Sequence, residues 1–156
     1  MPKITALIHA SNDAQRIRRT LDSLAPCDEV LVIDHDSNDD TGKIARDHGA
    51  KVKAAIVGVE DGTYVVDASN DWILCLLSSE ALAPDLQASL SEWKDRDPGS
   101  AVGFLMNVRE QTGNNWSSHG LEMRLVNHKK INWTGTLPPN ASKAPKLKGD
   151  VLRFKQ

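Results

Sequence analysis

Short polar stretches follow three apolar segments of this sequence. Each apolar segment has the length and composition of a buried strand. In a parallel sheet the carboxyl ends of the strands open onto one crevice, which is where ligands bind. The polar residues predicted at this crevice are His9, Ser11, Asp34, Asp36, Ser78 and Ser79. Their imidazole, hydroxyl and carboxylate groups can form hydrogen bonds, so the sequence predicts a polar ligand at this crevice.

The elements that position these side chains follow from apolar spacing and from turn residues. Parallel strands are expected at 3–9, 29–34, 51–57 and 72–77. The polar segments ASND and SNDD are good helix starts, and helices alternating with strands predict right-handed β-α-β crossovers. The sequence after residue 97 is β-rich, with a hairpin expected near 121–134. The predicted fold class is α/β, with three layers, a mostly parallel central sheet and a β-rich C-terminal part.

The composition sets limits on partners and location. The chain has 156 residues, which suits one domain, and its formal net charge of -2 gives no field that would gather nucleic acid. No apolar run reaches the length of a membrane span, and the first residues lack a signal peptide, so a cytoplasmic protein is expected. Cys27 and Cys75 are far apart, and no histidines have ligand spacing, so no metal site is predicted.

The N-terminal part resembles the family 2 glycosyltransferases, which use nucleotide sugars and have the GT-A fold. The resemblance is carried by ALIHASNDAQRIRRTLDSLAPCDEVLVIDHDSNDDTGKIARDHGAKV, in which Asn12, Asp34 and SNDDT match the family's turn, strand-end aspartate and loop. Later, NDWILCLLSSEALAPDL resembles the family segment GDWILFLDADERLSPEL, and EMRLVNHKKINWTG is weakly similar to its acceptor-side hairpin.

This resemblance implies one glycosyltransferase-like domain with three parts. Residues 1–97 would be the nucleotide-binding half, 98–140 the acceptor-side β-rich part and 141–156 a basic tail. The implied ligand is a UDP-sugar or another nucleotide, and Asp34 would accept a hydrogen bond from the uracil ring. The alternative is that Asp34 and the aspartates after it are loop and capping residues.

The sequence departs from the family at the metal-binding loop. Leu77, Ser78 and Ser79 stand where the family has Asp-x-Asp, and Glu80 follows in register. Hard cations such as Mg²⁺ or Mn²⁺ require charged oxygen ligands, so although the family implies such an ion, its ligands are missing here. Glu80 is expected in a solvated loop, where one carboxylate does not hold a divalent ion alone. We therefore predict no metal and no cofactor.

The catalytic base is also unassigned. The acceptor-side segment, where related members often have a His-Glu pair, has Pro138 and Pro139. Glu110 and Glu122 are alternatives, either as a base within reach of an acceptor hydroxyl or as ordinary surface charges.

Three functions remain open. The first is a degenerate glycosyltransferase-like domain that keeps the fold and has lost metal-dependent transfer. The second is an active, metal-independent enzyme whose diphosphate charge is met by Lys143, Lys146 or Lys148. The third is a non-catalytic module that binds a protein partner or a second copy, for which exposed Trp116 or Trp133 would be evidence.

Overall fold

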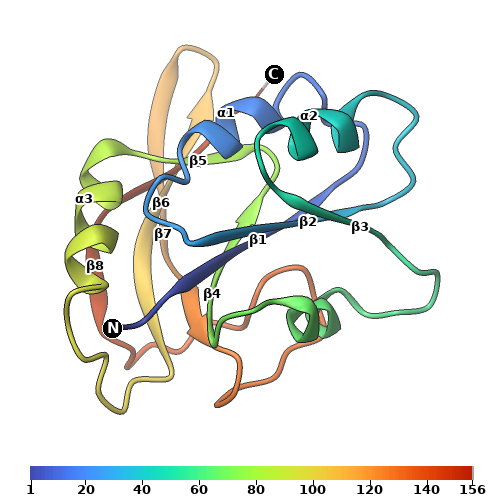
Figure 1. Cartoon of the computed structure of the whole chain (residues 1–156). Coiled ribbons are helices and arrows are strands. Elements are labelled where there is room, and N and C mark those ends of the chain that lie inside the picture. Colours follow the sequence, from blue (N-terminus) through green and yellow to red (C-terminus); the bar gives the residue numbers. More distant parts are fainter. Residues whose placement is uncertain (156) are drawn as a thin grey trace.

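The first half of the chain forms alternating strands and helices, as expected (Figure 1). The structure is a computed structural model, and it describes residues 1–155. In chain order this half contains β1 (Ile4–Ala10), α1 (Ile17–Asp22), β2 (Glu29–Asp34), α2 (Thr41–Asp47), β3 (Lys51–Ala54), the 3₁₀ helix η1 (Asp61–Asp67) and β4 (Trp72–Leu77). Strand β3 is shorter than predicted, because Ile56 and Val57 are exposed on a loop beyond it.

The second half adds four further strands to the same sheet. It contains β5 (Glu80–Leu82), α3 (Pro84–Trp93), β6 (Gly103–Thr112), β7 (Asn115–Asn127) and β8 (Lys146–Arg153). The eight strands lie in the order β3-β2-β1-β4-β7-β6-β8-β5. Strands β1 to β4 are mutually parallel, which confirms that prediction, and β7 joins β4 in the antiparallel sense.

The two faces of the sheet are covered differently. Leucines and isoleucines of α1 and α3, with Ala45 of α2, pack on one face against residues such as Ile8, Leu74 and Met106. The other face is covered by η1 and by a loop, through Tyr64 and Trp133. The mixed α/β class is confirmed, and its third layer is a 3₁₀ helix and a loop. Of the helices within residues 1–155, none has both the length and the apolar character needed to cross a membrane.

The C-terminal hairpin is placed differently from the prediction. Strands β6 and β7 pair from Gly103 to Thr112, and Thr112 lies opposite Asn115, so the turn is Gly113 and Asn114. Gly113 has φ +61°, a backbone conformation that favours glycine in two-residue turns. The hairpin expected near 121–134 is therefore wrong: β7 ends at Asn127, after thirteen residues, and the turn at 127–130 leads into a loop and not into a partner strand.

The segment predicted as a basic tail contains a strand inside the sheet. β8 pairs in parallel with β6 and antiparallel with β5. Its charged residues obscured this in the sequence, yet Val151 is fully buried and Arg153 lies opposite Glu80. An arginine in a strand is stable here because a buried carboxylate faces it.

We predict that Gly62→Ala destabilises the protein, because η1 packs closely on the loop that covers this face of the sheet. A methyl group at residue 62 would overlap the backbone carbonyl of Trp133. The expected loss is about 1–3 kcal/mol, as for other overpacked sites, measured by chemical denaturation. Gly135→Ala is the control: its φ is not in the left-handed region, and the new methyl group would meet only the Leu137 carbonyl at 3.8 Å, an ordinary contact. Equal losses in both variants would contradict close packing at residue 62.

Candidate functional site

The parallel register brings the predicted site residues to one edge of the sheet. His9 lies opposite Leu77 on β4, and Ala10 lies opposite Asp34 on β2. The loops that follow β1, β2 and β4 therefore meet at the same carboxyl edge, as predicted. What the side chains contact there differs from one loop to the next.

The loops after β1 and β2 are joined to each other by hydrogen bonds. Asn12 lies in the left-handed region at φ 52°. Its backbone N–H donates to the Ser37 hydroxyl, and its side-chain Oδ1 accepts the backbone N–H of Asn38 at 2.7 Å. The Ser11 hydroxyl donates to the His35 carbonyl at 3.1 Å. Asp36 also has a positive φ, of 56°, which aspartate tolerates better than most residues. These contacts make the two loops one unit.

Asp34 has the contacts of a loop residue. Its Oδ1 accepts the Ser37 amide at 3.2 Å and the Ser37 hydroxyl, and its Oδ2 lies beside Gly42 in the first turn of α2. The carboxylate therefore fixes the loop after β2, which is the loop role considered above, while α2 has no side-chain cap hydrogen bond.

Ser78 is buried and its hydroxyl is already used. It donates to Oδ2 of Asp13 at 2.7 Å, while the Ser78 carbonyl accepts the Thr20 hydroxyl at 2.9 Å. Asp13 also binds Arg16 through its other oxygen. Burial alone would raise the pKa of Asp13, but the hydrogen bonds from Ser78 and Arg16 hold that pKa below its ordinary value.

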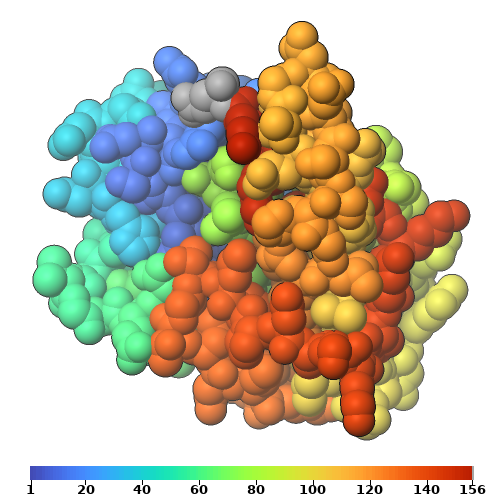
Figure 2. Space-filling model, turned by 180° about the vertical axis from the view of Figure 1, so that it is seen from behind, coloured from blue at the N-terminus to red at the C-terminus, as the bar shows by residue number. Residues whose placement is uncertain are grey.

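Ser79 is half-buried, and its backbone is bonded to the end of the chain. The Phe154 amide donates to the Ser79 carbonyl at 2.9 Å, and the Arg19 guanidinium lies 3.9 Å from the centre of the Phe154 ring. Figure 2 shows this end of the chain, in dark red, between the orange β6–β7 hairpin and the blue N-terminal part. Ser79, which stands where the family has its second aspartate, is therefore partly enclosed by the protein.

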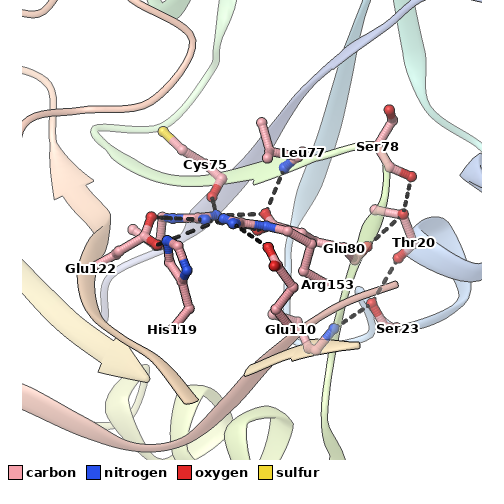
Figure 3. A network of polar contacts seen from close by, with 12 residues as sticks. Thr20, Ser23, Cys75, Leu77, Ser78, Glu80, Glu110, His119, Glu122 and Arg153 are labelled. Carbon is pink, nitrogen blue, oxygen red and sulfur yellow. Dashed lines mark hydrogen bonds and ion pairs between the residues drawn. The ribbon is translucent and has the colours of Figure 1, made fainter. Parts of the chain in front are cut away.

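Glu80 is buried in an ion-pair network, not solvated in a loop as we expected (Figure 3). Its side chain and that of Arg124 are both 0% exposed, and the two are joined by a bidentate pair of 2.6 and 2.8 Å. Arg153 donates to the same carboxylate at 3.0 Å, and the Leu77 amide at 2.8 Å. Burial alone would raise the pKa of Glu80, but Arg124 and these donors keep that pKa lowered.

The candidate bases belong to the same network. Glu122 accepts from Arg124 at 3.1 Å, and Glu110 pairs with Arg153 at 3.2 Å (Figure 3). Both carboxylates balance the charge of an arginine that Glu80 holds. The structure thus gives Glu110 and Glu122 the role of structural charges that neutralise arginines, and neither is a free base.

Of the lysines considered for a diphosphate, Lys143 is exposed on the loop before β8, and the other two lie beside α3. Lys146 and Lys148 begin β8 and line a cavity beside α3 with Ser89 and Trp93. Arg153, at the other end of β8, is the residue that faces Glu80 and the loop after β4. Lys146 pairs with Leu105, and Arg153 pairs with Glu110 five residues further along β6, so at about 3.3 Å per residue Lys146 lies roughly 17 Å from that loop. These two lysines do not meet a ligand at the carboxyl edge.

A cavity opens at the carboxyl ends of β2 and β3. It has a volume of about 310 Å³ and is lined by His35, Asp36, Asp61 and the loop 55–59. Of the predicted site residues Asp36 lines it directly, whereas Asp34, Ser11, Ser78 and Ser79 are engaged as described above. The exposed side chains of Ile56 and Val57 add an apolar rim.

Three residues converge beside this cavity in a way that sequence spacing did not indicate. Nδ1 of His9 is 2.8 Å from Nε2 of His35, and Oδ1 of Asp61 lies 3.7 and 3.8 Å from these nitrogens. Burial lowers the pKa of His9, Asp61 opposes this, and the His35 charge lowers it further. We had expected no ligand set among the histidines. Sequence spacing does not show this grouping, because it is formed by strand register and by η1 and no local motif records it.

The two tryptophans of the interaction hypothesis are both covered to some degree. Trp133 is 8% exposed and packs beneath η1. Trp116 is half-buried, and its ring meets the Phe154 ring edge-on at 5.0 Å. Neither offers the exposed aromatic surface that a partner-binding site would present.

Comparisons with known proteins identify relatives by sequence. No family model matches the chain. An uncharacterized glycosyltransferase of Rickettsia felis is 41% identical over 91 residues, which cover 56% of this chain and 32% of that protein. One of Rickettsia typhi is 31% identical over 147 residues, which cover 88% of this chain and 50% of that protein. The chain thus spans between a third and a half of the length of these curated relatives.

Solved structures with this fold include two bacterial proteins. TarS of Staphylococcus aureus, residues 1–349, superposes with a TM-score of 0.60 at 20% identity, covering 72% of this chain and 37% of that one. The second is glucosyl-3-phosphoglycerate synthase of Mycobacterium tuberculosis in complex with Mn²⁺, UDP-glucose and phosphoglyceric acid. It superposes with a TM-score of 0.54 at 22% identity, covering 72% of this chain and 45% of that one. By sequence the chain is similar to rickettsial proteins named glycosyltransferases, and its fold is the GT-A fold of these two solved structures.

Proposed function

We propose that this chain is a GT-A domain that binds the uridine part of a nucleotide and does not catalyse metal-dependent sugar transfer. One observation carries the loss of transfer. The loop after β4 offers a metal ion no available carboxylate, since Leu77, Ser78 and Ser79 have none and Glu80 is held by Arg124 and Arg153. Metal-dependent transfer requires a cation that bridges the protein and the departing diphosphate.

Nucleotide binding is supported by the position and the lining of the cavity. It lies at the carboxyl edge of parallel strands, beside the end of β2, where ligands of such sheets dock. Asp36 supplies a carboxylate that accepts from the N–H of a base, and the loop 55–59 supplies an apolar wall. The solved neighbour crystallised with UDP-glucose binds it with Mn²⁺. For this chain we propose the base contact without the metal.

The alternative of an active, metal-independent enzyme has less support. Lys146 and Lys148 lie beside α3, and Glu110 and Glu122 balance arginines, so these four residues supply neither a cation for the diphosphate nor a free base. The alternative of a protein-interaction module is not supported by Trp116 or Trp133, because neither is exposed. Neither alternative is favoured by a specific contact.

The test is binding of UDP to metal-free protein, followed by thermal unfolding and calorimetry. UDP at 100 times its Kd is expected to raise the free energy of unfolding by about 2.7 kcal/mol. Asp36→Gly is expected to weaken binding about tenfold, because it removes the charged acceptor and glycine tolerates the positive φ at this residue. The matched control is Asp47→Ala, a change of an exposed carboxylate on α2 away from the cavity.

Two results would contradict the proposal. Absence of any UDP effect at millimolar concentration would remove the nucleotide from it. Turnover of a UDP-sugar, measured as UDP release in the presence of Mg²⁺, would show that transfer or hydrolysis survives.

A further inference from the structure

The cluster of His9, His35 and Asp61 has the composition of a transition-metal site. Two imidazole nitrogens and one carboxylate oxygen lie within 4.8 Å of one another. Imidazole ligands suit zinc, copper, nickel and iron, whereas Mg²⁺ prefers oxygen ligands and keeps its waters. Two histidines with one acidic residue, plus a position for water, is a ligand set that zinc uses in proteins.

The distances fit a small ion between the three donors. Ligands bound to zinc at about 2.0–2.1 Å in a tetrahedron lie about 3.4 Å from one another. Here the separations are 2.8 Å between His9 and His35, and 3.7 and 3.8 Å from these to Asp61. Side-chain shifts of about half an ångström bring the three donors to equal spacing. The imidazole pair then exchanges its mutual hydrogen bond for two bonds to the ion.

The surroundings hold the donors in place. Oδ2 of Asp61 accepts the Thr136 hydroxyl at 2.7 Å, which turns Oδ1 toward the histidines. Such outer contacts commonly orient the ligands of metal sites. The ring of Tyr64 meets that of His9 edge-on at 5.8 Å.

His9 is suited to bind as a neutral ligand. Its side chain is 7% exposed, and within residues 1–155 its Nε2 has no hydrogen-bond partner. Burial of that nitrogen disfavours the imidazolium and so lowers the pKa of His9. The neutral imidazole is the form that coordinates a metal.

From this arrangement we infer that His9, His35 and Asp61 bind one zinc-type transition-metal ion, whose fourth coordination position opens into the cavity lined by His35 and Asp61. The site uses none of the residues 77–79, so it is separate from the loop where related enzymes hold their metal. The cavity leaves room for water or for an anionic ligand, such as a phosphate group, at the exchangeable position. The ion would also join β1, β2 and η1, which are distant in sequence.

The experiment uses untagged protein freed of metal with a chelator, titrated with Zn²⁺ in the absence of nucleotide. Calorimetry is expected to give one ion per chain, and His35→Gln and Asp61→Asn are each expected to weaken binding at least tenfold. These side chains are 36% and 27% exposed, so the variants should fold. His48→Gln is the matched control: it removes an imidazole that pairs with Asp22 on the helical side of the sheet, and binding should be unchanged. Omitting nucleotide keeps this result independent of the UDP test.

A second measurement does not depend on the variants. In the proton NMR spectrum of the wild-type protein, Zn²⁺ should shift the ring signals of His9 and His35 and leave those of His48, His119 and His128 in place. The two thiols do not compete for the ion at neutral pH, because burial raises the pKa of Cys27 and Cys75 to about 12 and a metal binds the thiolate. The inference is overturned if no saturable binding occurs, if His48→Gln weakens binding as much as His35→Gln, or if Zn²⁺ shifts the other histidines instead.

Discussion

Arg124→Met is expected to destabilise the protein by about 3–5 kcal/mol, the largest loss of stability that we predict. The reason is that Glu80 would keep its buried charge and lose the bidentate partner that compensates it. For a chain of this length such a loss lowers Tm by roughly 10 °C. Chemical denaturation and thermal unfolding both measure it.

Controls separate the buried pair from ordinary charge effects. Lys43→Met breaks an exposed pair with Asp47 and is expected to cost less than about 1 kcal/mol. The double change Glu80→Leu with Arg124→Met removes both buried charges, so it should recover part of the stability lost by Arg124→Met. A similar small loss in Arg124→Met and Lys43→Met would show that the network contributes little.

The pH dependence of stability should follow from Glu80. Its pKa is lower in the folded state than the ordinary 4.5, so the unfolded chain binds the proton more readily. The stabilisation from this group is therefore fully present above pH 4.5 and is lost as the pH falls through the folded value. In Arg124→Met the folded pKa rises, and that part of the acid dependence should shrink. Denaturation at pH 7 and pH 4 compares the two proteins.

Restoring two carboxylates in the loop after β4 is expected to make UDP binding depend on Mg²⁺. Leu77→Asp with Ser79→Asp supplies the charged oxygens that the ion requires. One unit-charge pair at 4 Å is worth roughly 4 kcal/mol at an effective dielectric of 20, whereas a neutral hydroxyl bond gives about 1 kcal/mol. We expect Mg²⁺ to tighten UDP binding at least tenfold in this variant and to have no effect on the wild-type protein.

The ion and the control variant are chosen to isolate the loop. Mg²⁺ avoids imidazole, so a site at His9 and His35 does not contribute. Leu77→Asn with Ser79→Asn has nearly the same shape without the charges, and it should show no gain. Calorimetry with UDP, with and without Mg²⁺, gives each Kd, and circular dichroism checks the fold. A tenfold metal-dependent gain in the wild-type protein would contradict the proposed loss of the metal site.

The sequence predicts best where local patterns and the sheet agree. Strands β1, β2 and β4 are nearly continuous apolar runs between good turn residues, so their parallel pairing could be expected. β8 could not, because KLKGDVLR is charged and interrupted by glycine, and its place in the sheet depends on a carboxylate more than sixty residues away. The strand propensity of a segment does not include contacts with residues that are distant in the sequence.

The candidate site was predictable only in its location. The carboxyl edge follows from parallel strands, which is why His9, Asp36 and Ser78 were placed there. Whether a side chain faces ligand or protein depends on neighbours that the sequence does not show: Asp13 engages Ser78, and Ser37 engages Asp34. Asp61 was missed because it reaches the histidines through η1, outside any motif.

The position of β8 between β6 and β5 bears on how the chain folds during synthesis. Residues 1–145 contain both of its neighbours, but until β8 is made each of them has an unpaired edge that invites association with other chains. The helix-covered parallel half is synthesised first and supplies most of the apolar core on its face of the sheet, so it can collapse early. Insertion of β8 then brings Arg153 to Glu80, so neutralisation of the buried carboxylate is completed by a late, long-range step.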